Sequence, residues 1–231
     1  MIYFNGIALE AVAPVKIEDI HVAPIPRNVT ARQRPILPGA DFVRATDGVR
    51  TVAISFGLLT QDMVQRARQL AWITSWARSE QPQRLELPYH EGRHFLAICT
   101  AFPEPSMRQW WESKLRLVFS CYDPFWRAND EKSVACGTAF SVLGDAPPLM
   151  RITNTFAEAA SDVAYTDGTD TMTFSAVAAG DLEIDLNAQT AALDGASIMS
   201  AYEFGSTFLR PRTGSQTITG AGVVHWRERW A

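Results

Sequence analysis

Hydrophobic and polar residues alternate along most of this chain, as they do in strands that bury one face. The alternation is clearest over residues 49–56, where Val52, Ile54 and Phe56 share a face and follow an Asp47-Gly48 turn signal. The same period recurs over residues 111–121, where one face would carry Trp111, Leu115, Leu117, Phe119 and Cys121, and again near residues 150–152, 172–174, 182–186 and 224–230. The pattern predicts a mainly β protein.

The chain opens with the signal of a β-hairpin. Asn5-Gly6 separates two short apolar runs, residues 2–4 and 7–9. Both central positions of a type I′ turn need a positive φ, which Asn and Gly tolerate. We therefore expect the first two strands to pair across this dipeptide.

Only residues 61–78 have the spacing of a helix. Thr60 is a suitable N-cap, and Asp62 in the first turn is favourably placed against the helix dipole. We expect one apolar stripe of this helix to face the protein. The stripe would carry Met63, Ala67, Leu70, Thr74 and Ala77.

Trp72 and Trp76 do not fall on that stripe. At about 100° per residue they project roughly 140° to 180° away from Met63, among polar residues. A helix with two apolar faces requires two partners. The second partner is either a further layer of the same chain, which would cover both tryptophans within the monomer, or a neighbouring subunit.

The chain is long enough for two domains of about 100 residues, each able to bury a core. Residues 127–133 have low hydrophobicity and are a candidate linker. We predict an N-terminal domain over residues 1–130, with a β-sandwich or barrel-like sheet and the helix, and a C-terminal domain over residues 131–231. The second domain contains only strand and turn signals, which favour a β-sandwich or jelly roll.

Composition argues against several classes of protein. Apolar residues make up 47% of the chain and charged residues 20%, which is typical of globular proteins. A net charge of −4 without a basic cluster argues against a nucleic-acid-binding protein, because contacts to phosphates need grouped Lys and Arg. No apolar run approaches the roughly 20 residues of a membrane span, and no signal-peptide pattern is present. Cys99, Cys121 and Cys136 are widely spaced and odd in number, so we expect buried free thiols.

The sharpest catalytic motif is His90-Glu91-Gly92-Arg93-His94, which matches the H-E-x-x-H pattern of zinc peptidases. That chemistry needs both histidines on one face of a helix, one turn apart. Here Pro88 precedes the motif, Gly92 lies at its centre and strand patterns flank it, so a hairpin turn is predicted instead. The nearest candidate third ligand, Glu112, lies in a strand pattern. We therefore predict no metal and no other cofactor.

Other candidate sites have simpler interpretations. Asp181, Glu183 and Asp185 alternate on one strand and share a face, which suits a carboxylate site for glycosides or calcium, or an ordinary solvated face. Trp226 and Trp230 share a face of the last strand, where they either stack on sugars or belong to the core. No nucleophile elbow or glycine-rich phosphate loop is present. The sequence predicts a protein that is not an enzyme.

A series of motifs in fixed order, spanning nearly the whole chain, resembles the siphophage distal tail proteins. The most specific is the junction from Phe119 to Phe125, similar to the family's strand that ends in Asp-Pro-Phe and closes the first domain. One loop departs from the family, since Pro211 to Gln216 replaces its Pro-Gly-x-Asn. The other motifs are Tyr3-Phe4-Asn5-Gly6, the Pro38-Gly39 and Asp47-Gly48 turns, the helix with Arg66, Leu70 and Trp76, Gly144 with Pro148 and Ile152, residues 180–185, Asp194-Gly195 and Phe208-Leu209-Arg210-Pro211.

The resemblance implies a homo-hexameric ring at the tail tip of a phage virion, assembled in the cytoplasm of the host bacterium. N-terminal domains of the tail-tube type would surround a channel through which the genome passes without specific binding. C-terminal domains with a galectin-like or jelly-roll sandwich would project outward and present surfaces for receptor-binding proteins. The tail tube protein and the tail-tip hub would be the other partners.

A ring would also give the helix its second partner, because each subunit meets its neighbour through two different patches. Trp72 and Trp76 are therefore candidate interface residues, and replacing both by Ala should weaken the ring while leaving the monomer folded. Six copies of a chain with charge −4 would carry −24 together, which suits a channel that must not hold phosphates.

Two rival functions remain open from the residues alone. A carbohydrate-binding β-sandwich protein is suggested by the lectin-like second domain and the seven tryptophans. A hydrolase of the host cell wall is the other. Glycan binding, lysis of wall preparations or a six-fold ring in electron micrographs would distinguish the three.

Overall fold

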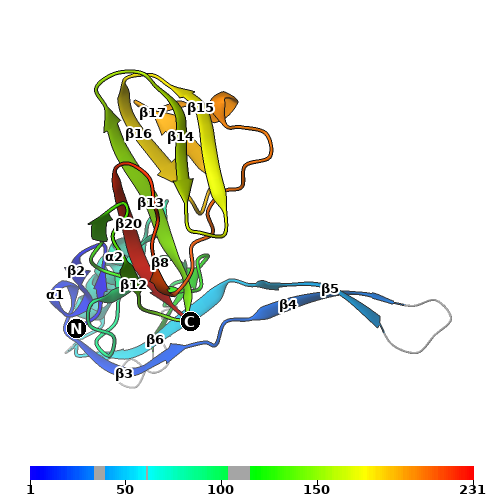
Figure 1. Cartoon of the computed structure of the whole chain (residues 1–231). Helices are drawn as coiled ribbons and strands as arrows, with labels where there is room; N and C mark the ends of the chain where they lie inside the picture. The colour runs from blue at the N-terminus through cyan, green and yellow to red at the C-terminus, as the bar shows by residue number, and fades with distance from the viewer. Residues whose placement is uncertain (34–39, 61, 104–114) are drawn as a thin grey trace. The chain divides into compact units, whose positions relative to one another are not determined.

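The computed structural model describes residues 1–33, 40–60, 62–103 and 115–231. The chain divides into two compact units, Met1–Trp126 (unit 1) and Arg127–Ala231 (unit 2). Strands dominate both, and the α-helices of the described residues are α1 (Leu9–Val12) and α2 (Met63–Ala77) (Figure 1). The predicted class, mainly β with one principal helix, is confirmed.

Unit 1 contains one antiparallel sheet in the order β2-β1-β7-β8-β9-β6-β3. Its first hairpin turns at Asn5 and Gly6, whose φ angles of 51° and 77° confirm the predicted turn. The strands are β1 (Tyr3–Phe4), β2 (Ile7–Ala8), β3 (Val15–Val22), β6 (Arg50–Leu58), β7 (Gln83–Glu86), β8 (Arg93–Ala101) and β9 (Leu115–Cys121).

The predicted strand faces are confirmed on β6 and β9, which pair with each other. Val52, Ile54 and Phe56 are fully buried on β6. On β9 the buried residues alternate with more exposed ones and are Leu115, Leu117, Phe119 and Cys121. Trp111 and the Pro38-Gly39 turn lie outside the described residues.

Helix α2 is shorter than predicted and begins at a different cap. Its N-cap is Asp62, in extended conformation, whose carboxylate accepts a hydrogen bond of 2.7 Å from the Gln65 backbone N–H. Thr60 is therefore not the cap, and Gln61 lies outside the described residues. An Asp carboxylate is at least as good an N-cap as a Thr hydroxyl, which explains the later start.

The buried face of α2 also differs from the predicted stripe. Met63 and Ala67 are exposed, whereas Leu70 and Ala77 are buried as expected. Periodicity alone gave the wrong face because two polar residues, Arg66 and Gln69, take buried places next to apolar ones. The buried residues are Arg66, Gln69, Leu70, Ile73 and Ala77.

Strands β4 (Arg27–Gln33) and β5 (Ala40–Asp47) form a separate two-stranded ribbon, which we call the arm. The chain enters it from β3 and returns into β6, and Figure 1 shows it extending well beyond the sheet of unit 1. All of β4 and nearly all of β5 is exposed.

The stretch predicted as a linker contains strands. Residues 127–133 contribute to β10 (Trp126–Ala128) and β11 (Lys132–Ala135), and β11 pairs with β20 (Val223–Trp230). Strand β11 has low hydrophobicity because most of its side chains are exposed, although its backbone is paired with β20. The structural division follows Trp126, whereas the sequence placed the boundary after residue 130.

Unit 2 packs one larger sheet against two small ones around a single core. The larger sheet has the order β18-β17-β16-β13-β20, and β11 adds to β20. The core contains Ile152, Ile184 and Val224 from this sheet and Tyr165 and Phe174 from the β14–β15 pair. The strands are β12 (Phe140–Val142), β13 (Ala146–Phe156), β14 (Ala160–Thr166), β15 (Thr171–Val177), β16 (Gly180–Asp185), β17 (Thr190–Leu193), β18 (Ala196–Ser197) and β19 (Gly214–Gln216), with a 3₁₀ turn η1 (Met199–Ala201).

Trp226 belongs to the core of unit 2. It is 6% exposed, and its ring centroid lies 4.6 Å from that of Phe140. It therefore offers no face for stacking on a sugar. Within the described residues, no helix is long and apolar enough to cross a bilayer.

Candidate functional site

Trp76 packs within its own chain. Its ring Nε1 donates a hydrogen bond of 3.0 Å to the carbonyl oxygen of Ile7. Its ring meets those of Phe4 and Phe119 edge-on, with centroids 5.6 Å and 6.4 Å away. The indole therefore ties α2 to the N-terminal hairpin and to β9, and its polar N–H has a partner as a partly buried Trp requires.

Trp72, one helical turn earlier, is 55% exposed. It lines an open hollow of about 430 Å³ on the surface of α2, beside the exposed side chain of Val64. The other lining residues are Asp62, Gln65, Arg68 and Gln69. The two predicted interface residues therefore differ in environment: Trp76 is partly buried against its own unit, and Trp72 is exposed.

The arm has one apolar and one polar face. Cross-strand partners lie on the same face of a ribbon, and so do residues two apart on one strand. Val29 faces Ala45 and Ala31 faces Phe42, so these four share a face. The other face carries Thr30 opposite Arg44 and Arg32 opposite Asp41, and the extra residue Val43 forms a bulge.

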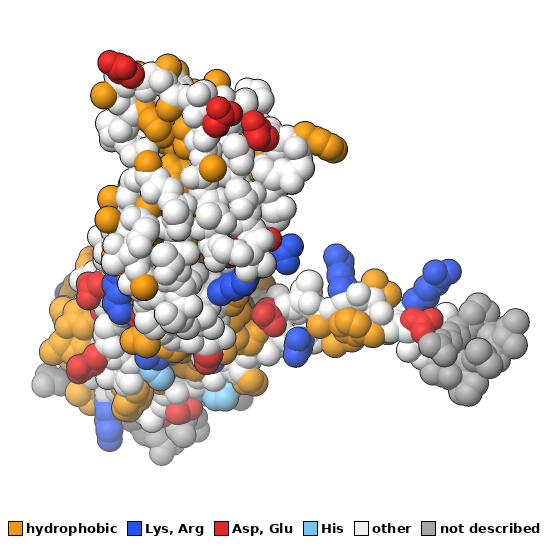
Figure 2. Space-filling model, in the orientation of Figure 1, with side chains coloured by type: hydrophobic (Ala, Val, Ile, Leu, Met, Phe, Trp, Pro, Cys, Tyr) orange, Lys and Arg blue, Asp and Glu red, His pale blue; other side chains and the backbone are white. Residues whose placement is uncertain are grey.

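The apolar face of the arm is open to solvent. Val29 is 62% and Phe42 67% exposed, and Figure 2 shows hydrophobic side chains gathered along the middle of the arm. A two-stranded ribbon is marginally stable by itself, and exposed apolar patches mark interaction sites. Alternation within residues 27–33 and 40–47 was the sequence signal for this face, but it did not show that the ribbon would leave the sheet.

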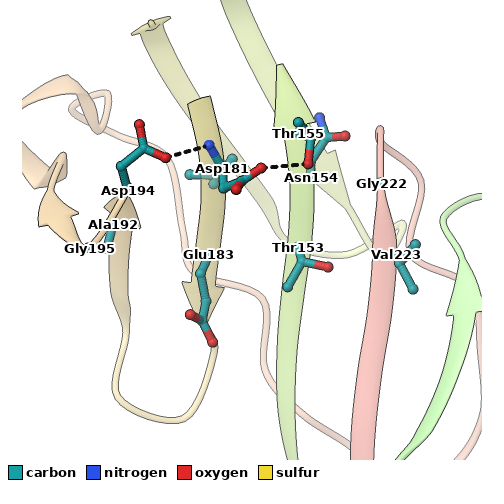
Figure 3. Close-up of a pocket in the computed structure, with 11 residues that line it drawn as sticks. Thr153, Asn154, Thr155, Asp181, Glu183, Ala192, Asp194, Gly195, Gly222 and Val223 are labelled. Carbon is teal, nitrogen blue, oxygen red and sulfur yellow. Dashed lines mark hydrogen bonds between the residues drawn. The ribbon is translucent and has the colours of Figure 1, made fainter. Parts of the chain in front are cut away.

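A hollow of about 550 Å³ lies on the outer face of the larger sheet of unit 2 (Figure 3). The Asp181 carboxylate accepts a hydrogen bond of 2.7 Å from Thr155 Oγ1, and the Asp194 carboxylate accepts one of 2.9 Å from the Asp181 backbone N–H. No aromatic residue is among its described lining residues. These are Thr153, Asn154, Thr155, Asp181, Leu182, Glu183, Ala192, Asp194, Gly195, Gly222 and Val223.

The three alternating carboxylates of β16 share an exposed face as predicted, but each has a local partner. Glu183 binds the Arg151 guanidinium at 2.9 Å, and Asp185 accepts two backbone N–H groups of the following turn. Arg151 also binds Glu131 at 2.9 Å, and this hydrogen bond lowers the pKa of Glu131. These contacts are typical of a solvated strand face.

The H-E-x-x-H motif lies in a hairpin turn between β7 and β8, as predicted. His90 is largely exposed, and its ring centroid lies 4.3 Å from that of Trp126. The partial burial of its ring, followed by the charges of Arg93 and Arg50, lowers its pKa. His94 is buried at the start of β8. The described residues hold no group of three or more His, Cys, Asp or Glu suited to a metal, and Glu112 lies outside them.

The three cysteines are free thiols, two of them buried. Burial raises the pKa of Cys121 to about 12 and that of Cys99 to about 11, and it raises the pKa of the half-buried Cys136 as well. A thiol is a nucleophile or a metal ligand only as the thiolate. The raised pKa values keep the buried Cys99 and Cys121 side chains as thiols at neutral pH.

The Asp-Pro-Phe junction at the end of β9 is held by a buried arginine. Arg50 donates hydrogen bonds to the carbonyl oxygens of Ala23 at 2.7 Å and Pro124 at 3.1 Å. Its guanidinium carbon lies 5.4 Å from the centroid of the Phe95 ring, an arrangement that favours a cation. One side chain thus joins the end of β3, the start of β6 and the junction.

Sequence comparison gives no relative for this chain, since no family model and no curated protein matches it. The chain does match solved structures. The whole chain superposes with a TM-score of 0.76 on the Dit (gp 19.1) protein of phage SPP1, described as a paradigm of the hub adsorption apparatus in phages that infect Gram-positive bacteria. Identity is 13%, and the match covers 100% of this chain and 98% of that one.

The chain has the fold of a phage distal tail hub protein. This confirms, at the level of the fold, the resemblance that the ordered motifs indicated. A chain of the phage P2 baseplate, in its activated conformation with Ca, is also similar, with a TM-score of 0.47, 5% identity and coverage of 96% of this chain and 92% of that one.

Proposed function

We propose that this chain is a structural protein of a phage tail tip, which forms a ring of six copies between the tail tube and the tail-tip hub. The observation that carries the proposal is the full-length match to SPP1 Dit, in which both units take part. The match extends over both units, so a single known two-unit fold accounts for the described residues of this chain.

The arm and α2 give such a ring its contacts. A ring needs two different patches on each subunit that fit one another. The apolar face of the arm, with Val29 and Phe42, is one exposed patch, and the exposed side of α2, with Trp72, is another. We propose that both are covered by neighbouring subunits.

The charge of the two units refines the channel hypothesis. Residues 1–126 carry 14 Lys and Arg and 12 Asp and Glu, a net charge of +2, whereas residues 127–231 carry 7 and 13, a net charge of −6. The acidic excess therefore lies in the unit proposed to project outward. A channel lined by unit 1 would be close to neutral, which still lets DNA slide without specific binding.

The rival functions receive less support. A carbohydrate-binding module would stack sugars on aromatic rings beside a hollow, but Trp226 is in the core and no aromatic residue is among the described residues that line the outer-face hollow. A wall hydrolase would rely on a pair of poised carboxylates, and those of β16 are engaged in local contacts. We therefore propose a role in assembly rather than catalysis.

Native mass spectrometry and negative-stain microscopy of the purified full chain test the proposal. We expect a species of six times 25.6 kDa and ring-shaped particles with six-fold symmetry. A chain that stays monomeric at concentrations of about 100 μM, or that closes into a ring of another order, would overturn it.

A further inference from the structure

Phe204 stands fully exposed on a turn of unit 2, with a relative accessibility of 108%. The turn is closed by a hydrogen bond of 3.2 Å from the Ser206 backbone N–H to the Glu203 carbonyl oxygen, which also accepts from Ser206 Oγ at 2.9 Å. Gly205 has a φ of +91°, as the third residue of a type II turn requires. Phe204 is the second residue of this turn, and its side chain contacts the solvent.

Both ends of the turn are fixed to the body of unit 2. The backbone N–H of Glu203 donates to the Thr173 carbonyl oxygen at 3.0 Å, and that of Thr207 donates to the Thr171 carbonyl oxygen at 2.8 Å. These bonds fasten the turn to β15 on either side of Phe204. A large apolar side chain is thus held in solvent by an ordered backbone.

Two aromatic residues beside the turn add to this anchoring. The Tyr202 ring stacks on that of Phe208 at 4.9 Å and meets Phe174 edge-on at 5.7 Å. Phe208 itself is buried in the core. Binding a partner would therefore cost little ordering of this loop, which is the condition under which one aromatic residue contributes most to affinity.

The surroundings of the turn indicate the charge of such a partner. Residues 152–209 contain nine Asp and Glu and no Lys, Arg or His; four of the nine lie on or beside the larger sheet, and Glu203 lies in the turn itself. Arg210 and Arg212, which follow this stretch, reach Asp170 at 3.8 Å and 3.4 Å. Figure 2 shows acidic side chains on the upper part of the visible face of unit 2, over β15 and β17, with the basic side chains of this face lower in the view.

We propose that the Phe204 turn is a docking site for a protein whose contact surface holds an apolar pocket ringed by Lys and Arg. Phe204 fills the pocket, and the carboxylates around it meet the basic rim and speed the encounter. DNA, anionic wall polymers and anionic lipids do not fit this surface, because its carboxylates outnumber its guanidinium groups and would repel them. The choice of partners to test rests on the proposed tail-tip role.

The full chain should be assayed by biolayer interferometry against each purified tail-tip and receptor-binding protein of the same phage. We expect one of them to bind, and Phe204→Ala to weaken the affinity at least about 30-fold, as for other central aromatic anchors. Leu143→Ala, which removes another exposed apolar side chain of unit 2, is the matched control and should change the affinity less than about twofold.

Charge is tested separately. The triple variant Glu158→Gln, Asp162→Asn and Glu203→Gln should slow association about 10-fold at 50 mM NaCl and have little effect at 500 mM. The same number of neutralised carboxylates in unit 1, Glu18→Gln, Glu80→Gln and Glu91→Gln, should leave the rate unchanged.

Three results would overturn the proposal: equal binding by wild type and Phe204→Ala, no binding by any of these proteins, or self-association of the chain that Phe204→Ala abolishes, which would make a second copy the occupant. Ring formation by Phe204→Ala, seen by negative stain, separates this site from the ring. If the wild type forms no ring, the proposed function is contradicted. The Phe204 docking site would still stand if a partner binds the wild type and not Phe204→Ala.

Discussion

Trp76 Nε1 donates a 3.0 Å hydrogen bond to the carbonyl oxygen of Ile7, and this contact joins the principal helix to the first hairpin of the chain. It also changes the meaning of the tryptophan pair on α2. One member packs against its own unit, and the other, Trp72, is exposed and is our candidate for the proposed subunit interface.

We therefore expect single substitutions of the two tryptophans to act differently. Trp76→Ala should lower the free energy of unfolding by about 2 to 3 kcal/mol, because it removes aromatic packing and leaves the Ile7 carbonyl without its donor. Trp72→Ala should change it by less than about 0.5 kcal/mol, as is usual at exposed sites. Urea denaturation followed by circular dichroism measures both.

Native mass spectrometry of the same variants tests the ring. Trp72→Ala should shift the population from hexamer toward monomer without loss of fold, and it is a cleaner test than the double alanine variant, in which the monomer itself is weakened. A hexamer as stable in Trp72→Ala as in the wild type would remove Trp72 from the interface.

A charge on the apolar face of the arm should prevent ring closure. Phe42→Asp places a carboxylate where we propose that a neighbouring subunit packs, and burying an unpaired charge there is costly. The monomer should keep its stability, since Phe42 is 67% exposed. Thr46→Asp adds the same charge to the opposite face of the ribbon and serves as the control, with assembly followed by size-exclusion chromatography with light scattering.

Arg50 should be essential to the stability of unit 1. Arg50→Met keeps much of the side-chain volume but leaves the carbonyl oxygens of Ala23 and Pro124 without their donor, at a cost of about 3 kcal/mol. Lys16→Met, on the exposed side of β3, should cost less than about 0.5 kcal/mol. Equal urea midpoints for the two variants would contradict the role given to Arg50.

The buried thiols should make the protein less stable at alkaline pH. Folding raises the pKa of Cys121 to about 12 and of Cys99 to about 11, above their ordinary value of 9.0, so the folded state holds these protons more tightly than the unfolded state. The stability linked to these groups is fully present below pH 9 and is lost as pH rises toward 11 and 12. Urea midpoints at pH 8 and pH 10.5 measure the fall.

A double variant isolates this effect. Cys99→Ala with Cys121→Ala should show a shallower fall between the two pH values, although its stability at pH 8 is lower because of the lost packing. In the wild type at pH 8, a thiol reagent such as DTNB should label the buried pair only after urea is added. Rapid labelling of both in the native protein would show that they are not protected.

The sequence by itself determined the local structure of this protein. The period of two on β6 and β9, the Asn5-Gly6 turn, the hairpin at His90 to His94 and the existence of a helix all follow from residues a few positions apart, which is the range over which backbone preferences act. The order of weak motifs along the chain was also enough to indicate the fold. The strand character of residues 127–133 was missed because an exposed strand lacks the apolar signal.

Only the tertiary structure decided which surfaces are buried and which are exposed. Which face of α2 is buried, which tryptophan is free, and that the arm leaves the sheet all depend on contacts between distant segments, as between Trp76 and Ile7, 69 positions apart. The rigid setting of Phe204 likewise depends on bonds from its turn to β15. The hydrophobic pattern of the sequence shows which side chains favour burial, but whether one is buried depends on whether another segment of the chain packs against it.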